Sequence, residues 1–137
     1  MNTTLAAPCP LRLAPGDDLR GRIEALARER GVAAAFVVCG IGSLARTAIR
    51  FAGATQLEIH EGSVEIVSLA GSISPDGAHL HGAFADASGH VFGGHVALGC
   101  TVRTTAEILI AELPGWIFSR RRDAVTGYLE LVIKART

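Results

Sequence analysis

The chain has 137 residues, with 13 basic and 13 acidic side chains, 49% hydrophobic residues and a mean hydropathy of +0.35. This size and apolar content predict one compact domain over residues 1–137, because domains of about 100–150 residues are the commonest kind. A net charge of zero argues against electrostatic capture of nucleic acid or of an anionic membrane surface. The apolar stretches are interrupted well before the roughly 20 residues of a membrane helix, so no membrane association is expected.

The beginning of the chain and its cysteines suggest a cytoplasmic location. Residues 1–10 carry no basic residue ahead of an apolar run, so no secretory leader is predicted. Cys9, Cys39 and Cys100 are an odd number at wide spacing, which suits reduced thiols better than a disulfide framework. Each is expected to be a small apolar filler, as buried cysteines usually are.

One amphipathic helix is predicted near the start of the chain, over Asp17–Arg30. Pro15 and Gly16 indicate a turn, and the two aspartates that follow are typical of a helix N-terminus. Apolar residues then recur at helical spacing, and Gly31 is a plausible end of the helix. The apolar positions are Leu19, Ile23, Leu26 and Ala27.

Everything after this helix is typical of β-strands, because apolar and β-branched runs alternate with Gly, Pro, Asp and Ser. The short links favour antiparallel pairing, since a parallel pair needs a long crossover. The fold class is therefore α+β, a mostly antiparallel sheet with one main helix. Residues 106–113 could be helical by propensity, but we favour a strand. The expected strands are Cys9–Leu13, Ala34–Ile41, Arg46–Phe51, Gln56–His60, Val64–Ile73, His79–Asp86, His90–Leu98, Thr101–Ile110, Ile117–Arg120 and Tyr128–Ala135.

Two of these strands form a hairpin rich in histidine and glycine. A three-residue loop over 87–89, with Gly89 in the left-handed conformation, pairs His81 with His95. That register gathers apolar residues on one face and His79, His81 and His95 on the other. A two-residue turn would move His95 to the opposite face. The apolar face would contain Leu80, Phe84, Phe92, Val96 and Leu98.

In the three-residue register, the three imidazoles are close enough to bind one ion, which points to a divalent metal such as Zn(II). The small residues nearby leave space for an exogenous ligand: Gly82, Ala83, Gly93 and Gly94. A His-x-His pair on a strand is nevertheless more often a pair of surface imidazoles. His60 and His90 lie next to predicted turns and are expected to be solvated.

Six blocks of this sequence resemble the PPC domain, the plants-and-prokaryotes-conserved domain that accompanies an AT-hook in land plants. The similarity covers about residues 10–134. It implies an antiparallel sheet with few helices, assembled as a homotrimer. It also implies that His79, His81 and His95 match the histidines with which bacterial and archaeal members can hold a metal. The blocks are Pro15–Leu19, Gly40–Leu44, Val64–Ser74, His79–His81, Gly89–His95 and Thr104–Glu107.

Nucleic-acid binding is weakly supported by the residues themselves. Plant relatives bind A/T-rich DNA through an Arg-Gly-Arg-Pro core, but Arg20-Gly21-Arg22 is followed by Ile23 and lies in the predicted helix. The basic run Arg120-Arg121-Arg122 is followed by an aspartate and is expected to be a solvated loop, which in a trimer could form a weak phosphate patch.

Two carboxylates are candidates for proton transfer beside a metal, Glu107 and Asp86. Glu107 stands in an apolar run and is expected to pair with Arg103, Arg46 or Arg50, or else to act as a general base. Gly40–Ser43 lacks the lysine of a phosphate-binding loop and is interpreted as a turn between strands.

The leading hypothesis is a homotrimer with a three-histidine zinc site that binds a small anionic or polar ligand, whether or not it is an enzyme. The alternatives are a DNA-associated or partner-binding regulator without its own AT-hook, and a purely structural trimer.

Overall fold

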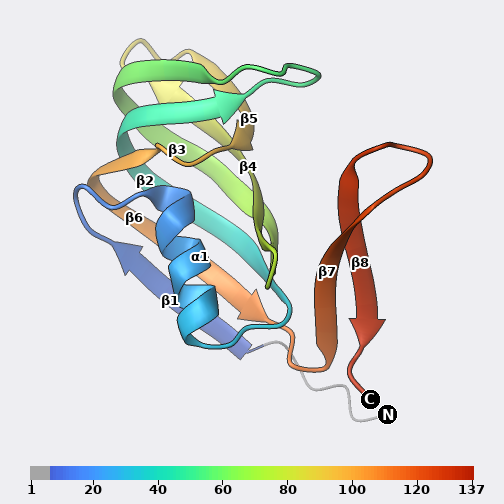
Figure 1. Cartoon of the computed structure of the whole chain (residues 1–137). Helices are drawn as coiled ribbons and strands as arrows, with labels where there is room; N and C mark the ends of the chain where they lie inside the picture. Colours follow the sequence, from blue (N-terminus) through green and yellow to red (C-terminus); the bar gives the residue numbers. More distant parts are fainter. Residues whose placement is uncertain (1–6) are drawn as a thin grey trace.

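The computed structural model describes residues 7–137 of the chain. One helix and eight strands make up this part (Figure 1). Within residues 7–137, no helix is long and apolar enough to cross a membrane. The elements are β1 (Ala7–Leu13), α1 (Leu19–Glu29), β2 (Ala35–Arg50), β3 (Glu58–Ser74), β4 (Gly77–Asp86), β5 (Val91–Val96), β6 (Thr101–Glu112), β7 (Trp116–Arg122) and β8 (Leu129–Ala135).

Six strands form the main sheet, in the order β1-β6-β2-β3-β4-β5, and every pairing is antiparallel. The end of β2 also pairs with β5, through Ile49 with Val96 and Arg50 with His95. Strands β2 to β5 therefore close into a ring, and this closure brings the end of β2 beside the histidine hairpin. The predicted α+β class, with a mostly antiparallel sheet and one helix, is confirmed.

Helix α1 is two residues shorter at its start and one shorter at its end than predicted, and it lies against β3, β4 and β6. Asp18 caps it, because its Oδ1 accepts a hydrogen bond from the Gly21 N–H at 2.8 Å. Its Oδ2 accepts another from the Gly99 N–H at 2.6 Å, which ties the helix to the segment before β6. Gly31 follows the helix with a φ of +63°, as expected for its end.

Strands β2 and β3 are each longer than predicted, because two expected strands merge in both. The Gly40–Ser43 segment, interpreted as a turn, runs through the middle of β2. Gly42 has a φ of +139°, and a Cβ there would collide with the backbone of Thr105 and Ala106 on β6. These glycines allow a neighbouring strand to approach closely, and they do not end the strand.

The core lies between α1 and the sheet and inside the closed ring. Leu80, Phe84 and Val96 of the hairpin are fully buried, but Leu98 is exposed because β5 ends at Val96. Cys100 is a buried filler as predicted, whereas Cys39 is exposed. The largest buried side chains are Phe84, Phe118, Leu13, Leu19, Ile23, Leu44, Ile49, Leu69, Ile73, Leu80, Val37 and Val96.

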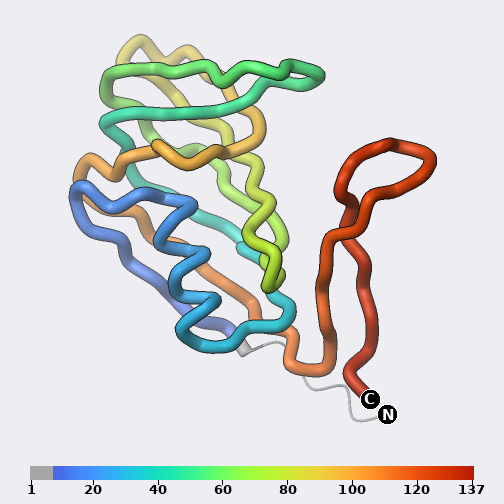
Figure 2. Tube along the Cα trace, viewed as in Figure 1, coloured from blue at the N-terminus to red at the C-terminus, as the bar shows by residue number. Residues whose placement is uncertain are grey.

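Strands β7 and β8 form a two-stranded hairpin, here called the arm, that stands beside the main sheet (Figures 1 and 2). Phe118 anchors it by burying its ring edge-on against Phe36, with ring centroids 5.6 Å apart. Arg120 anchors it again, because its Nη2 donates to Ser72 Oγ at 2.6 Å and its backbone N–H donates to Asp76 Oδ2 at 2.8 Å. The predicted loop at Arg120–Arg122 is therefore wrong, and these arginines end strand β7.

Candidate metal centre and the groove beside it

The hairpin between β4 and β5 has the predicted register. His81 pairs with His95 and Phe84 with Phe92. Gly89 has a φ of +81°, and its N–H donates to the Asp86 carbonyl at 2.9 Å, which closes the three-residue loop. This local turn chemistry determines which face each histidine occupies.

The three predicted histidines lie together on one face of the hairpin. Their ring centroids are 4.9 Å apart for His79 and His81, 5.1 Å for His79 and His95, and 6.0 Å for His81 and His95. One ring nitrogen from each lies within 4.8 Å of the other two. His81 is exposed, while the other two are half-buried.

The donor set suits a divalent transition metal. A tetrahedral zinc ion with Zn–N bonds of about 2.0–2.1 Å places two nitrogens roughly 3.4 Å apart. The upper limit of 4.8 Å between the ring nitrogens is therefore within reach of small side-chain rotations. Three imidazoles leave a fourth position for water or a ligand, as in sites that bind or transform small molecules.

Two of the histidines are held neutral by their surroundings. Burial lowers the pKa of His95 to about 4, with further lowering by His79 and by the positive charge of Arg50. Burial also lowers the pKa of His79, and the positive charge of Arg120 adds to this effect. A neutral imidazole keeps the lone pair that binds a metal, so these two side chains are ready to bind at neutral pH.

The histidines line a hollow of about 430 Å³ together with residues 50–53 and the glycine pair of β5. Gly93 and Gly94 were predicted to leave space, and they do line this hollow. They also let strands approach, because a Cβ on Gly94 would lie 2.5 Å from the Arg50 carbonyl oxygen. Gly82 and Ala83 were grouped with them in the prediction but do not line the hollow.

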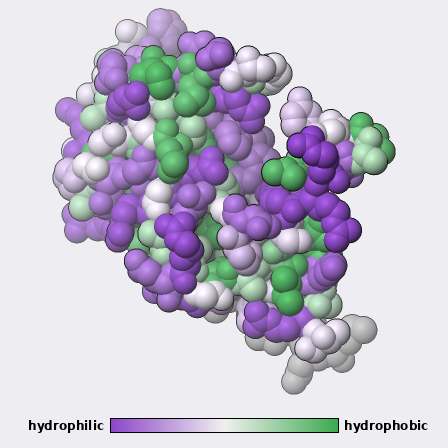
Figure 3. All heavy atoms as spheres, in the orientation of Figure 1, coloured by the Kyte–Doolittle hydropathy of each residue, from purple (hydrophilic) through white to green (hydrophobic). Residues whose placement is uncertain are grey.

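A larger groove of about 730 Å³ joins this centre on the side of the arm. His79 and His95 lie on its sheet side, and β7 and the start of β8 form its other side. Most spheres are hydrophilic where the arm and the sheet face each other (Figure 3). Sequence reasoning singled out neither Arg20 nor Arg50 as a site residue, because only the three-dimensional fold brings them here. Four arginines line the groove: Arg20, Arg50, Arg120 and Arg122.

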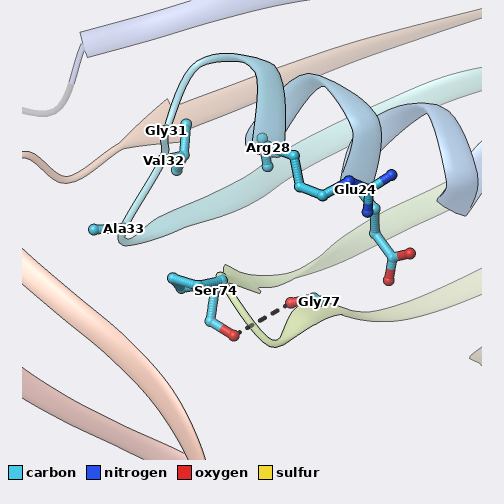
Figure 4. Close-up of a pocket in the computed structure, with 9 residues that line it drawn as sticks. Glu24, Arg28, Gly31, Val32, Ala33, Ser74 and Gly77 are labelled. Atoms are coloured by element: carbon cyan, nitrogen blue, oxygen red, sulfur yellow. Dashed lines mark hydrogen bonds between the residues drawn. The ribbon is translucent and has the colours of Figure 1, made fainter.

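Helix α1 fixes the start of strand β4, which carries His79. Glu24 Oε1 accepts a hydrogen bond from the Ala78 N–H at 3.0 Å and another from Arg20 Nε at 2.9 Å. Figure 4 shows this region, with Ser74 Oγ donating to the Gly77 carbonyl oxygen at 3.4 Å across the turn. The side chains drawn there include no second cluster of metal ligands. The contacts of this pocket hold the start of β4 in position, and no metal site is assigned to the pocket itself.

The two carboxylates proposed for proton transfer lie elsewhere. Glu107 is exposed on β6, opposite Arg12 and Ile41, and has no ion pair within residues 7–137. The expected partner Arg46 binds Glu61 instead, at 2.8 Å.

Asp86 lies at the loop end of the hairpin. Its Oδ1 accepts hydrogen bonds from the backbone N–H groups of Ser88 and His90 at 2.9 and 3.0 Å, so this side chain shapes the loop. His90 is exposed as predicted, but His60 is half-buried with its ring 5.2 Å from that of Phe92.

Comparison with known proteins places this architecture in a family. The chain matches the Plants and Prokaryotes Conserved (PCC) domain over residues 3–114. It is 47% identical over 125 residues to the Bifunctional protein GlmU of Synechococcus sp. strain JA-2-3B'a(2-13), covering 91% of this chain and 20% of that protein. The chain thus spans about a fifth of the length of this curated relative.

Solved structures share the whole fold. A hypothetical protein from Salmonella enterica superposes with a TM-score of 0.95 at 40% identity, covering 99% of both chains. A metal-containing protein from Archaeoglobus fulgidus gives 0.79 at 27% identity and 96% coverage of both. A protein from Ralstonia eutropha, provisionally named a DNA-binding protein, gives 0.77 at 25% identity, covering 90% of this chain and 89% of that one. The chain belongs to the Plants and Prokaryotes Conserved domain family, the PPC domain that its sequence blocks resemble.

Proposed function

We propose that this protein binds one divalent metal, zinc in the first instance, through His79, His81 and His95, and that the metal centre binds a small ligand. The observation that carries the proposal is the convergence of three ring nitrogens within 4.8 Å beside a hollow. The metal-containing relative from Archaeoglobus fulgidus adds support.

The metal-binding role would be divided among three histidine side chains. The three imidazoles would hold the ion, which would supply a positive charge that polarises a ligand oxygen. Burial keeps the imidazoles of His79 and His95 neutral, so binding needs little loss of protons. Neither Glu107 nor Asp86 is placed to move a proton there, so turnover is not part of the proposal.

A thermal-shift titration with zinc tests the metal site. Preferential binding to the folded state adds about 2.7 kcal/mol of stability when the metal is at a hundred times its dissociation constant. We expect zinc to raise the melting temperature of the chelator-treated protein and to have no effect on His81→Ala. His90→Ala is the matched control, because this exposed histidine lies on the same hairpin outside the cluster. An equal response of all three proteins would refute the site.

Assembly as a homotrimer is part of the same proposal. Large apolar side chains remain exposed on the two longest strands, among them Val38, Ile41 and Val67. Such a surface is expected at a subunit interface. Light scattering should give three times the chain mass of 14.3 kDa, and a monomer would contradict this part.

Association with DNA is the second candidate, favoured by the relative from Ralstonia eutropha and by the arginines at the end of β7. In this case a generic A/T-rich duplex would be retarded by the protein, and the retardation would weaken steeply with salt as phosphate contacts are lost. His81→Ala would leave it unchanged. Absence of any retardation at low salt would remove this candidate.

A further inference from the structure

The groove beside the metal centre is positively charged, although the chain as a whole is neutral. Its lining holds four arginines against two carboxylates, Asp76 and Glu130, and Glu24 beside the groove pairs with Arg20, so an excess of one positive charge remains with the histidines neutral. A cleft lined by one sign of charge concentrates counter-ions of the other sign. The groove is therefore a place where an anion is favoured.

Three of these arginines have no anionic partner within residues 7–137. Arg20 pairs with Glu24 at 2.9 Å, but the guanidinium groups of Arg50, Arg120 and Arg122 bind only neutral oxygens. Arg50 Nη1 donates to the Ala54 carbonyl at 3.4 Å, and Arg122 Nη1 donates to the Gly127 carbonyl at 2.6 Å. Each guanidinium has five N–H donors, so most of them remain available to a ligand.

The two carboxylates of the groove are already engaged. Asp76 Oδ2 accepts the backbone N–H of Arg120 at 2.8 Å, and Glu130 Oε1 accepts the hydroxyl of Thr126 at 3.0 Å. The hydrogen bonds to carbonyl and hydroxyl oxygens hold the guanidinium groups of Arg50, Arg120 and Arg122 in place but do not balance their positive charge. An anion that enters the groove offsets this positive charge, and a forked guanidinium suits phosphate and carboxylate oxygens.

The geometry points to the phosphate group of a small phosphorylated molecule as the ligand of this groove, held by Arg50, Arg120 and Arg122 next to the metal centre. Three guanidinium groups without an anionic partner can engage more oxygens than the two of a single carboxylate, which favours a phosphate. Tetrahedral phosphate also presents oxygens in several directions at once, toward Arg50 on the sheet and toward the two arginines on the arm. This inference specifies the ligand of the proposed function, and it depends on that proposal for the presence of a metal beside the groove.

Calorimetric titration of inorganic phosphate and of glycerol phosphate tests the inference, on protein purified with its own metal and on chelator-treated protein. We expect Arg50→Gln and Arg120→Gln each to weaken binding about tenfold or more. Arg103→Gln, an exposed arginine of β6 outside the groove, should bind within twofold of the wild type. Arg50 makes one long neutral contact, so its variant remains informative even if the loss of Arg120 loosens the arm.

Equal phosphate affinity in the wild type and both groove variants would overturn the inference. So would an A/T-rich duplex that displaces phosphate and binds far more tightly through the same arginines, because the ligand would then be nucleic acid. Metal content is measured on the same samples. If protein purified without chelator contains no metal but its phosphate binding still depends on Arg50, the metal site is refuted and the arginine site stands. If that protein contains metal but its phosphate binding does not depend on Arg50, the arginine site is refuted and the metal site stands.

Discussion

Gly94→Ala is expected to open the closure between β2 and β5 on which the metal centre depends. A Cβ at this position would lie 2.5 Å from the carbonyl oxygen of Arg50 and 3.2 Å from its carbonyl carbon. Both are backbone atoms and cannot rotate away, so the two strands must separate. The pairs that form the closure lie directly beside this point, Arg50 with His95 and Ile49 with Val96.

The magnitude follows from the overlap. Ordinary contact begins near 3.4 Å, so the backbones have to move apart by most of an ångström. Overpacking of this kind costs about 1–3 kcal/mol. For a domain of this size, each kcal/mol lowers the melting temperature by roughly 3–4 °C, which gives a loss of about 3–12 °C. His95 follows Gly94 directly, so zinc affinity should fall as well.

Thermal unfolding and zinc titration of Gly94→Ala and Gly115→Ala measure the effect. Gly115 is the matched control, because nothing lies within 4 Å of its Cβ position and its φ is not in the left-handed range. Its variant should stay within about 0.5 kcal/mol of the wild type. Equal melting temperatures for the two variants, or unchanged zinc affinity in Gly94→Ala, would refute this explanation of the glycine pair.

Two further predictions concern the core and the histidines. Phe84→Ala should lower the free energy of unfolding by about 3–5 kcal/mol, because the Phe84 side chain is fully buried between the strands β2 to β5. Urea denaturation measures this loss, and a value below about 1 kcal/mol would contradict the packing. The metal-free protein should become less stable as the pH falls from 6.5 to 4. In this range His95 is protonated in the unfolded chain but stays neutral in the folded protein, where its pKa is about 4. The loss should be on the order of 1 kcal/mol after solvent screening of a half-buried group. His95→Gln should reduce it, with a remainder from His79, whose pKa is also lowered by burial. An unchanged pH dependence in that variant would show that other groups are responsible.

The histidine hairpin could be predicted from the sequence because local chemistry determines it. The alternation of residues 79–86 fixes the faces, and Asp86 with Gly89 fixes the loop. Glu107 shows a local signal that was missed. It stands between the buried residues Ala106 and Ile108, so the two-residue period of a strand directs it outward, where it needs no partner.

The rest of the site depends on contacts between segments that are distant in sequence. Gly42 gives the same local signal as a turn glycine, and only the close approach of β6 explains why the strand continues through it. Arg20 lies on the helix, Arg50 ends β2 and Arg120 lies on the arm, and they meet only because β2 closes on β5 and the arm stands beside the sheet. No periodic pattern in the sequence predicts that these three arginines line the same groove.

Elemental analysis of the protein purified without chelator, beside its His81→Ala variant, tests the central claim most directly. His81 is exposed, so its removal should leave the fold intact while taking away one of the three ligands. The metal centre predicts about one divalent ion per chain in the wild type and little in the variant. Absence of metal from both proteins, or equal metal in both, would contradict it.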